Sequence, residues 1–421
     1  MRTRRFEWGG AAETATAIRA WVAESAVPVD VLPIEREVLE VGDEAVLRLT
    51  AQFDAPGNPP EELRVDPALA TRALVDLDPT LRTALDVAAA NIRAVAEAQL
   101  AEPSREVTLP QGQTVTVRWV PVGAAGIYAP GGRAAYPSSV LMCAIPAQVA
   151  GLERIALASP PGPDGNLHPL VLAAAALCGI DEIYAMGGAQ AIFALAHGTE
   201  TVTPVDVIAG PGNTWVREAK RTVYGTVGID SLAGPSELML IAGHDADPEW
   251  AALDLCAQAE HGADSPLVLV AVEQHVLDAI AAATESAAAA RPEVADAAFA
   301  LILVPDLSDA ADLANAFAPE HLQLFEEDAA LLAERITAAG CVFAGRFAAT
   351  AFGDYVAGSN HVLPTGGAGR FTGPLGPAAF GRRISTVEVS PEAAAELAPH
   401  VNALARAEGF PVHGESAMIR R

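Results

Sequence analysis

The feature that most constrains the fold of this chain is an alternation of short apolar runs with longer segments of helical periodicity between Leu152 and Ala242. The segments between the runs have the length and pattern of helices and end near Cys178, His197 and Tyr224. The apolar runs lie at Arg154–Ser159, Glu182–Met186, Val205–Ala209 and Leu238–Ala242. Strands that alternate with helices at this spacing predict a parallel, doubly wound sheet.

The same alternation continues beyond Ala242 and predicts a second α/β unit. We expect helices at Pro248–Glu260 and Glu273–Ala290. We expect strands at Pro266–Val272 and Leu301–Val304. The predicted fold class is therefore α/β with two doubly wound units, and small helical segments are expected at both ends of the chain.

The other segments are predicted to be helical apart from one hairpin. Residues 1–25 are expected to form a short N-terminal helix, and the alanine-rich tail from about Ser390 a small helical appendage. Residues 67–100 are expected to be helical with a break at Asp78-Pro79, an N-cap followed by proline at the first helical position. Apolar and polar residues alternate within 107–120 on both sides of a Pro-Gln-Gly turn, which predicts a hairpin.

Net charge narrows the partners that this chain can bind. Its 421 residues carry 26 lysines and arginines against 53 aspartates and glutamates, a formal charge of −27. A field of that sign repels nucleic acid and anionic membranes, whereas it tolerates or attracts a cationic substrate. The same charge also serves solubility, so it does not by itself identify the substrate.

The apolar stretches predict a cytoplasmic protein without a membrane span. The two longest, at 169–180 and 138–152, are too short or too interrupted to cross a bilayer. An arginine cluster at residues 2–5 is followed by Glu7 and by no apolar stretch, so no signal peptide is predicted.

Cysteine and lysine usage excludes several kinds of site. Cys143, Cys178, Cys256 and Cys341 show no paired spacing. Reduced, buried thiols are therefore expected, and neither disulfides nor a cysteine-rich zinc knuckle is predicted. The single lysine, Lys220, lies in a helical run without a Gly-Lys-Ser/Thr context. The chain thus contains no Walker A loop, and a pyridoxal Schiff base is not expected.

Glycine turns after two predicted strands indicate a place for a phosphate-bearing cofactor. Met186–Gln190 and Ala209–Asn213 both stand between a strand and a helix, where backbone N–H groups can bind phosphate. A third loop, Tyr128–Arg133, adds an aromatic residue. The turns also serve simply to join strand to helix tightly, and none matches Gly-x-Gly-x-x-Gly.

Polar clusters farther along the chain indicate metal and acid–base chemistry. Gln258 and His261 share one face at the end of a predicted helix, and zinc favours imidazole nitrogen with an oxygen ligand beside it. By itself this pair is better explained by a surface histidine at a helix C-terminus, where a cation suits the helix dipole. Glu320-His321 places an acid beside an imidazole, as proton transfer requires. Polar residues also gather at 353–361 and 408–413.

Six strings in this order resemble the signature segments of the histidinol dehydrogenase family. They are APGGRAAYPSSVLM at 129–142, IAGPGN at 208–213, GIDSLAGPSE at 228–237, QAEHG at 258–262, APEHL at 318–322 and GSNHVLP at 358–364. The resemblance runs from about residue 30 to the end of the chain.

The resemblance implies a homodimeric zinc enzyme that oxidises L-histidinol through L-histidinal to L-histidine with two NAD, in the last steps of histidine biosynthesis. It implies zinc ligands Gln258, His261, Asp354 and His413, the last from the tail of the partner subunit, and proton acceptors Glu320 and His321. It implies substrate contacts from Ser236, Gln258, His261, His321, Asp354, His361, Glu408 and His413. It implies NAD contacts from Tyr128, Gln190 and Asn213.

The fold that the resemblance implies is a pair of incomplete Rossmann-like domains, one inserted in the other. Residues 26–127 and 236–365 would form the zinc-carrying domain, and residues 128–235 the inserted domain with the NAD loops. Residues 366–421 would complete the partner's active site.

The residues indicate how such a reaction would proceed. His321 suits the removal of the alcohol proton, because imidazole titrates near working pH, and Glu320 is placed to activate water for the aldehyde step. A thiohemiacetal on Cys143 or Cys256 is the alternative, but both lie in apolar runs. Zinc would orient the substrate or act as a Lewis acid, and the first role is favoured.

Three other functions stay open at this point. A zinc NAD dehydrogenase of the same fold acting on another amino alcohol or polyol would differ only in its substrate pocket. A zinc hydrolase with Glu320 as base would leave the glycine loops unused. A non-catalytic binding protein would have no use for the Glu320-His321 pair.

Overall fold

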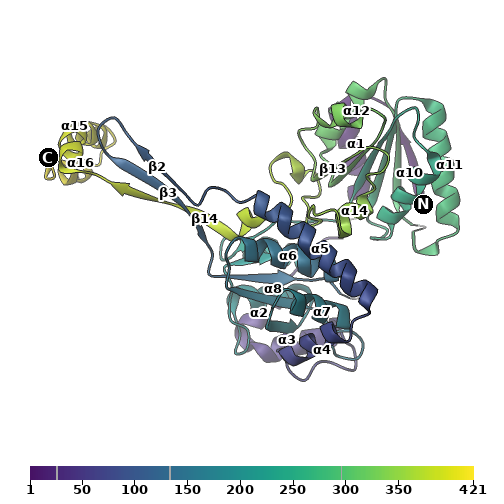
Figure 1. Cartoon of the computed structure of the whole chain (residues 1–421), viewed down its shortest axis with the longest axis horizontal. Coiled ribbons are helices and arrows are strands. Elements are labelled where there is room, and N and C mark those ends of the chain that lie inside the picture. Colours follow the sequence, from purple (N-terminus) through teal and green to yellow (C-terminus); the bar gives the residue numbers. More distant parts are fainter. Residues whose placement is uncertain (25–26, 132–133, 295) are drawn as a thin grey trace.

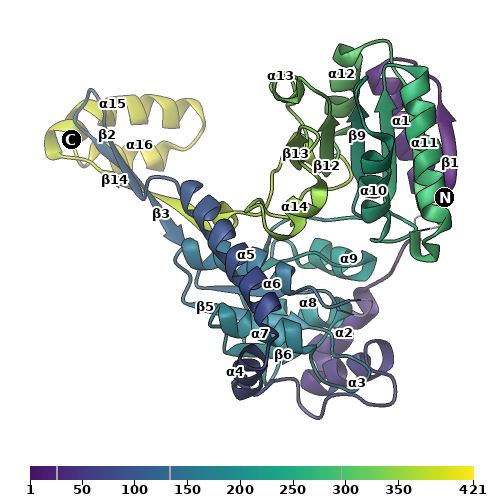
Figure 2. The same ribbon diagram turned by 45° about the vertical axis from the view of Figure 1, so that its right-hand side comes forward.

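A computed structural model describes residues 1–24, 27–131, 134–294 and 296–421. Two parallel sheets, of five and six strands, stand beside each other, and a three-stranded antiparallel sheet extends from them (Figures 1 and 2). The strands are β1 (Arg2–Phe6), β2 (Ser104–Thr108), β3 (Thr114–Pro121), β4 (Ala124–Tyr128), β5 (Arg154–Ser159), β6 (Glu182–Ala185), β7 (Val207–Ala209), β8 (Gly228–Ile229), β9 (Leu238–Ala242), β10 (Pro266–Ala271), β11 (Ala298–Leu303), β12 (His321–Phe325), β13 (Cys341–Ala344) and β14 (Gly381–Glu388).

Helices cover both faces of each parallel sheet. They are α1 (Ala11–Ala23), α2 (Leu32–Val41), α3 (Asp43–Phe53), α4 (Pro67–Val75), α5 (Pro79–Ala98), α6 (Pro137–Val149), α7 (Pro169–Leu177), α8 (Gly188–His197), α9 (Thr214–Val223), α10 (Pro248–Ala259), α11 (Gln274–Ala289), α12 (Leu307–Phe317), α13 (Ala329–Ala333), α14 (Thr350–Tyr355), α15 (Pro391–Ala407) and α16 (Pro411–Met418). Short 3-10 turns lie at η1 (Pro292–Val294), η2 (Ala368–Arg370) and η3 (Pro377–Phe380).

The five-stranded sheet confirms the predicted parallel α/β unit. Its strands run in the order β6-β5-β4-β7-β8 and all pair in parallel. Alternate residues of each strand point to opposite faces. Ile127 and Leu157 therefore pack with α6 and α7, whereas Tyr128 and Ala158 pack with α8 and α9.

The helices before this sheet also belong to it, which corrects one predicted boundary. Residues 26–127 were expected in the zinc-carrying domain, but α4 packs on α7, α5 on α6, and α2 and α3 on α8. Ala88 and Ile92 of α5, for example, join the core around β4 and β5. An apolar stripe shows that a helix is covered, but it does not specify which sheet covers it.

The six-stranded sheet confirms the second α/β unit, with the order β1-β11-β10-β9-β12-β13. Its first strand corrects the expectation that residues 1–25 form only a helix, because Arg2–Phe6 pairs in parallel with β11 before α1 begins. This strand is at the sheet edge and its first four side chains are exposed. It therefore lacks the apolar run by which the buried strands are predicted.

Both parallel sheets share one strand order. If β1 is left aside, the strands of each sheet follow the sequence order 3-2-1-4-5, as in the first five strands of a dinucleotide-binding fold. In this order the chain reverses direction across the sheet between its strands 1 and 4. That reversal lies between β4 and β7 in one sheet and between β9 and β12 in the other.

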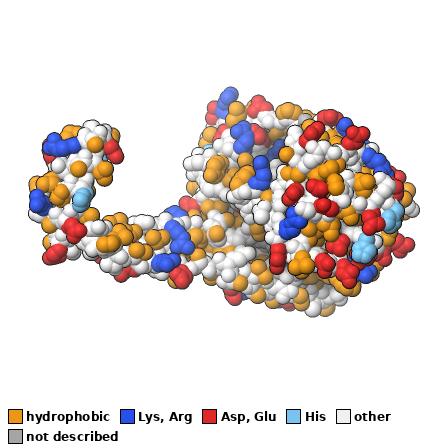
Figure 3. All heavy atoms as spheres, turned by 90° about the horizontal axis from the view of Figure 1, so that it is seen from above, with side chains coloured by type: hydrophobic (Ala, Val, Ile, Leu, Met, Phe, Trp, Pro, Cys, Tyr) orange, Lys and Arg blue, Asp and Glu red, His pale blue; other side chains and the backbone are white. Residues whose placement is uncertain are grey.

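An arm formed by β2, β3, β14, α15 and α16 extends away from the two sheets (Figures 1 and 2). The predicted hairpin is confirmed as β2 and β3, and β14 pairs with β3 on its other side. The predicted helical tail is confirmed as α15 and α16, which pack against each other. Figure 3 shows the arm standing clear of the body with hydrophobic side chains along its surface.

Two further expectations can be compared with the structure. Within the described part of the chain, no helix is both long and apolar enough to cross a bilayer. All four cysteines are free thiols. Cys143, Cys178 and Cys256 are buried as expected, whereas Cys341 is only partly buried.

Candidate active site

Glu320 and His321 lie at the N-terminal edge of the six-stranded sheet. His321 is the first residue of β12 and stands in register between Leu238 of β9 and Cys341 of β13. Both side chains are buried, at 5% exposure for Glu320 and 2% for His321. The preceding Ala318 ends α12 with φ of 49°, a left-handed conformation that non-glycine residues rarely adopt and that is common at functional sites.

The Glu320 carboxylate is held by hydrogen bonds from the segment that precedes β9. Its Oε2 accepts from the Ser236 hydroxyl at 2.6 Å and from the Glu237 backbone N–H at 2.8 Å. The Glu237 side chain, also buried, forms an ion pair with Arg19 of α1 and accepts from the Gly366 N–H at 3.2 Å. Burial raises the pKa of Glu237, although the Arg19 hydrogen bond opposes that shift. Glu320 is thus fixed in one orientation.

The His321 ring presents one nitrogen without a hydrogen-bond partner. Nδ1 lies 3.2 Å from the Glu237 carbonyl oxygen, which only accepts, so Nδ1 carries the proton in the neutral ring. Nε2 is buried, makes no hydrogen bond to the described residues, and lies 3.4 Å from Asp354 Oδ1. Burial lowers the pKa of His321, but the negative charges of Glu320 and Asp354 outweigh it and hold the pKa well above its ordinary value.

Gln258 offers a buried oxygen to the same region. Its Nε2 donates to Ser236 Oγ at 2.7 Å and to Ser265 Oγ at 3.2 Å. The other amide atom, Oε1, is buried without a partner among the described residues. A buried amide oxygen left unpaired costs free energy unless a ligand completes it.

Asp354 and His261 lie near each other, beside the helix that carries Gln258. Asp354 lies in α14, which packs against α10, and His261 follows the end of α10. Burial raises the pKa of Asp354, yet the neighbouring imidazoles of His321, His361 and His261 outweigh it, so that the pKa is lowered overall. Three of the four predicted zinc ligands therefore lie together in one chain.

His361 supports this cluster from the side. Its Nδ1 lies 2.9 Å from the Asp354 backbone oxygen, and its Nε2 lies 3.0 Å from Ser139 Oγ of α6. Burial lowers the pKa of His361, against the opposing charge of Asp354. The ring thus ties the α14 segment to the five-stranded sheet's helices.

The predicted residues Glu408 and His413 do not join the cluster within the chain. Both are exposed, in the arm that carries α15 and α16, away from α10 and α14 (Figures 1 and 2). The His413 ring packs on Phe410, with centroids 5.6 Å apart. Their assignment to the partner subunit's site stays a prediction.

The predicted NAD residues lie at the carboxyl edge of the five-stranded sheet, where β4 and β7 separate. Asn213 is exposed and caps α9, its Oδ1 accepting from the Trp215 and Val216 N–H groups. Tyr128 and Gln190 are buried, at 3% and 1% exposure. The Tyr128 hydroxyl accepts from the Gly188 N–H at 3.1 Å, and Gln190 Nε2 donates to Asp54 at 3.0 Å. Gly132 and Arg133 of the third glycine loop lie outside the described residues.

The loop after β7 is held by the single lysine of the chain. Gly210 has φ of +125°, and a Cβ there would collide with the Tyr128 carbonyl oxygen. Lys220 Nζ donates to the Gly210 carbonyl at 3.0 Å and forms a buried ion pair with Asp230. Asp230 Oδ2 in turn accepts from the Gly210 N–H at 2.8 Å. Lys220 therefore positions the turn that leads to Asn213.

Several of these residues had no role in the sequence analysis. Arg19, Asp54 and Glu237 act through contacts with segments far away in the chain, and Ser265 acts on the nearby Gln258, but no local pattern marks any of them. Glu237 is the last residue of the GPSE string and follows Ser236, but its position in the string does not by itself indicate a function.

The arrangement brings together a buried imidazole, a fixed carboxylate and further oxygen and nitrogen donors. Comparisons with known proteins also indicate a dehydrogenase. The family model described as histidinol dehydrogenase matches residues 19–421. A histidinol dehydrogenase of Ruegeria pomeroyi is 44% identical over 97% of this chain and 96% of its own length. One of Rhodospirillum rubrum is 45% identical over 96% and 95%.

A solved structure is similar along the whole chain. The crystal structure of a histidinol dehydrogenase from Elizabethkingia anophelis superimposes with a TM-score of 0.90 at 32% identity. The match covers 100% of this chain and 98% of that one. The two chains thus share their overall α/β fold.

Proposed function

Since the chain belongs to the histidinol dehydrogenase family of oxidoreductases, which serves histidine biosynthesis, we propose that it oxidises L-histidinol through L-histidinal to L-histidine, with zinc and two NAD. The observation that carries the proposal is the free Nε2 of His321, buried beside Asp354 and next to the fixed carboxylate of Glu320. A buried imidazole nitrogen that makes no hydrogen bond to the described residues is placed to exchange a proton with a substrate.

In the first oxidation, His321 Nε2 takes the hydroxyl proton of histidinol while a hydride leaves the carbinol carbon, with NAD as the oxidant. The product is the aldehyde. Because the Glu237 carbonyl accepts a hydrogen bond from Nδ1–H, the ring loses its other proton from Nε2, and the neutral ring then has its lone pair on Nε2. Removal of a proton by a positioned base typically accounts for about 10²–10⁴-fold in rate.

In the second oxidation, water adds to the aldehyde and the hydrate loses a second hydride to a second NAD, giving the carboxylate. Glu320 is the proposed base for that water. Ser236 and the Glu237 N–H bind one of its oxygens, which leaves the other oxygen to face a water molecule. The thiols of Cys143 and Cys256, the alternative nucleophiles, are buried, and burial raises the pKa of both, which disfavours the reactive thiolate.

The residues present fit a zinc ion. Gln258 Oε1 has no partner among the described residues, because Ser236 and Ser265 bind the amide nitrogen, and Asp354 and His261 lie near each other on adjoining elements. We assign Gln258, His261 and Asp354 as ligands, with His413 of the partner as the fourth. When bound, zinc would orient the imidazole and amine of histidinol or polarise its oxygen.

A second copy of this chain is the proposed source of the missing ligand. The arm exposes Val387, Leu404, Phe410, Val412 and Ile419, each more than half exposed. An extended apolar surface of this kind is typical of a protein interface. With the arms exchanged in a twofold dimer, His413 and Glu408 would reach the other subunit's cluster, where Glu408 suits the ammonium group of histidinol.

The remaining assignments follow from the same model. Ser236, His321 and His361 would complete the substrate site. NAD would bind at the turns after β4, β6 and β7, near Tyr128, Gln190 and Asn213, where parallel sheets of this order bind their ligands. Because Tyr128 and Gln190 are buried, we expect Asn213 to make the more direct contact. The absence of paired cysteines accords with the proposed cytoplasmic location.

One experiment tests the proposed reaction against its rivals. The enzyme is mixed with limiting L-histidinol and excess NAD, with and without a chelator, and NADH is measured at completion. Two NADH per histidinol, lost with the chelator and restored by zinc, are expected. A hydrolase would form no NADH. A dehydrogenase for another amino alcohol or polyol would turn over that compound in preference to histidinol.

A complementation experiment tests the shared site. His321→Ala and His413→Ala homodimers are both expected to be nearly inactive. When the two variants are denatured and refolded together, half of the dimers are mixed and each contains one intact site, so about a quarter of wild-type activity should return. No recovery, with mixed dimers present, would contradict the partner's contribution of His413.

A further inference from the structure

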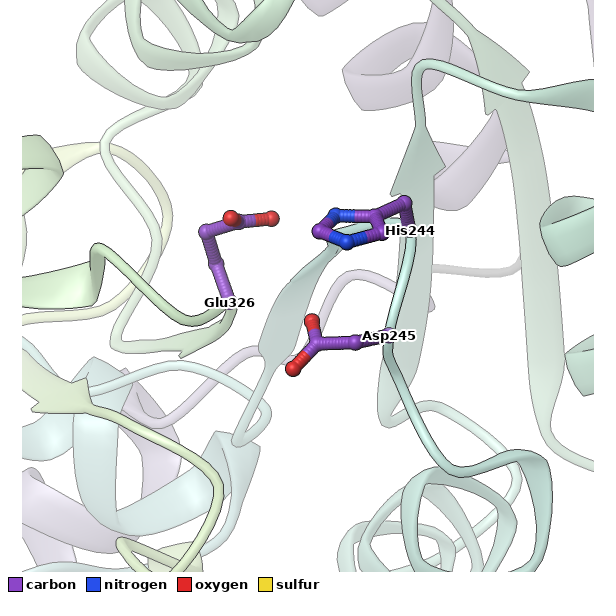
Figure 4. A group of neighbouring side chains, drawn as sticks. All are labelled: His244, Asp245 and Glu326. Carbon is purple, nitrogen blue, oxygen red and sulfur yellow. The ribbon is translucent and has the colours of Figure 1, made fainter.

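Three metal-ligating side chains converge at the edge of the six-stranded sheet opposite to His321. His244 and Asp245 lie in the loop after β9, and Glu326 directly follows β12. One ligand atom from each side chain can be chosen so that all lie within 4.8 Å of one another. Figure 4 shows the three side chains directed toward a common space between the two strand ends.

The position of this cluster in the fold is that of a ligand site. In open parallel sheets, ligands bind outside the carboxyl ends of the strands, at the point where the strand order reverses. In this sheet the reversal lies between β9 and β12, and the three residues stand at the carboxyl ends of these two strands. The candidate active site uses the opposite, N-terminal ends of the same strands. The cluster therefore lies apart from the site described above.

Glu326 itself points to a missing partner. The residue is 9% exposed, and none of the described residues donates a hydrogen bond to its carboxylate or forms an ion pair with it. A carboxylate on a residue this little exposed, with no donor beside it, is open to a cation from solvent, and His244 and Asp245 are exposed on that side. The nearest polar groups in the cluster are another carboxylate and an imidazole, neither of which supplies a fixed positive charge.

Gly243 is the residue that lets Glu326 lie where it does. A Cβ at position 243 would collide with Glu326 Oε2. The carboxylate thus lies across the backbone that leads from β9 to His244, instead of extending into solvent. The missing side chain at Gly243 leaves room for the Glu326 carboxylate beside the loop after β9. The donors of His244, Asp245 and Glu326 therefore lie close together.

We propose that His244, Asp245 and Glu326 bind a divalent transition-metal ion such as Zn²⁺. Two carboxylates and one imidazole supply three ligands of the kinds that zinc uses in proteins, and water would complete the shell. The imidazole favours a transition metal over Mg²⁺ or Ca²⁺, which prefer oxygen ligands alone. The ion would join two strand ends that are about eighty residues apart in the chain, and it would stabilise the folded state by mass action.

The site can be tested by metal stoichiometry on the full-length enzyme. Wild type, Glu326→Gln and His244→Ala are dialysed against Zn²⁺ at graded concentrations, and bound metal is measured by atomic absorption. Wild type should bind one more zinc per chain than either variant, or the variants should bind the last zinc about tenfold or more weakly. Zinc should also raise the melting temperature of wild type more than that of the variants.

Glu327→Gln is the matched control, because it removes the same charge from the exposed neighbouring residue. It should retain the additional zinc. Equal stoichiometry and affinity in wild type, Glu326→Gln and His244→Ala would overturn the proposal, as would an equal loss in Glu327→Gln. Circular dichroism checks that each variant folds. Turnover of histidinol should be unchanged in all three variants, so that failure of this site is distinguishable from failure of the catalytic assignment.

Discussion

The two parallel sheets share a strand order but carry the residues proposed for function at opposite edges. In the five-stranded sheet, the turns after β4, β6 and β7 place Tyr128, Gln190 and Asn213 at the carboxyl edge. In the six-stranded sheet, Glu320 and His321 stand at the N-terminal edge. The carboxyl edge of that sheet carries the cluster of His244, Asp245 and Glu326.

This difference shows that strand order specifies where a ligand can bind, but not which edge carries the chemistry. The carboxyl edge is favoured because loops and helix N-termini converge there. At the N-terminal edge of the six-stranded sheet, the proposed site forms because other segments meet this edge, namely α1 with Arg19 and α14 with Asp354. Four changes test how far the two sheets and the two edges act separately.

The largest effect is expected from a comparison of two histidines on the same sheet. His321→Ala should lower kcat by about 10²–10⁴-fold, because it removes the proposed proton acceptor. His244→Ala, at the other edge, should leave kcat within about twofold of wild type, since surface changes remote from a site are usually neutral. Steady-state NADH formation with histidinol measures both. Comparable losses in the two variants would contradict the separation of the edges.

The next largest effect is expected at the carboxyl edge of the five-stranded sheet. Lys220→Met leaves Asp230 buried without its partner, which should lower the free energy of unfolding by about 3–5 kcal/mol. Urea denaturation followed by circular dichroism measures the change. In Lys220→Met/Asp230→Leu, where neither charge remains, most of that stability should return. If the double variant is no more stable than Lys220→Met, the ion pair does not explain the loss.

A pH-dependent effect is expected from Asp54, which accepts the hydrogen bond of Gln190. Burial raises the pKa of Asp54 to about 6, against the opposing hydrogen bonds of Gly187 and Gln190. A carboxyl whose folded-state pKa lies above its unfolded value destabilises the fold when it ionises, so this cost grows from about pH 4 to about pH 6 and then stays constant. Two pKa units correspond to about 3 kcal/mol.

Asp54→Asn should therefore be more stable than wild type at pH 7 by up to about 3 kcal/mol, with the difference vanishing below about pH 4. Urea denaturation at pH 4, 5, 6 and 7 measures it. Asp181→Asn, an exposed acid near the same sheet, should show no such trend. A difference between Asp54→Asn and wild type that is independent of pH would rule out the titration of Asp54 as its cause.

The smallest effect compares the glycines at the two strand reversals. Gly210→Ala places a Cβ against the Tyr128 backbone at φ of +125°, which should cost about 1–3 kcal/mol and raise the KM for NAD. Gly243→Ala collides mainly with the movable carboxylate of Glu326, with the Glu326 Cα at 3.3 Å, so its cost should be smaller and the KM for NAD unchanged. Thermal melting and initial rates at varied NAD distinguish them. Equal changes in KM would argue against a NAD role for the Gly210 turn.

Much of the fold followed from local patterns. Continuous apolar runs such as Arg154–Ser159 and Leu238–Ala242 identified buried parallel strands, and Asp78-Pro79 marked the start of α5. The prediction missed the edge strand Arg2–Phe6, because the exposed side chains of this strand form no apolar run. The placement of residues 26–127 was also wrong, since an amphipathic helix does not specify its partner.

The sequence by itself determined the family, the parallel α/β units and the chemical kinds of residue available for a metal and for proton transfer. Only the tertiary structure decided which of them meet. Gln258 Oε1 is free because Ser236 and Ser265 hold the rest of the amide, and Arg19 balances Glu237 from the far end of the chain. Burial and long-range hydrogen bonds leave no local pattern in the sequence. Only the tertiary structure therefore shows which distant segments contact each other.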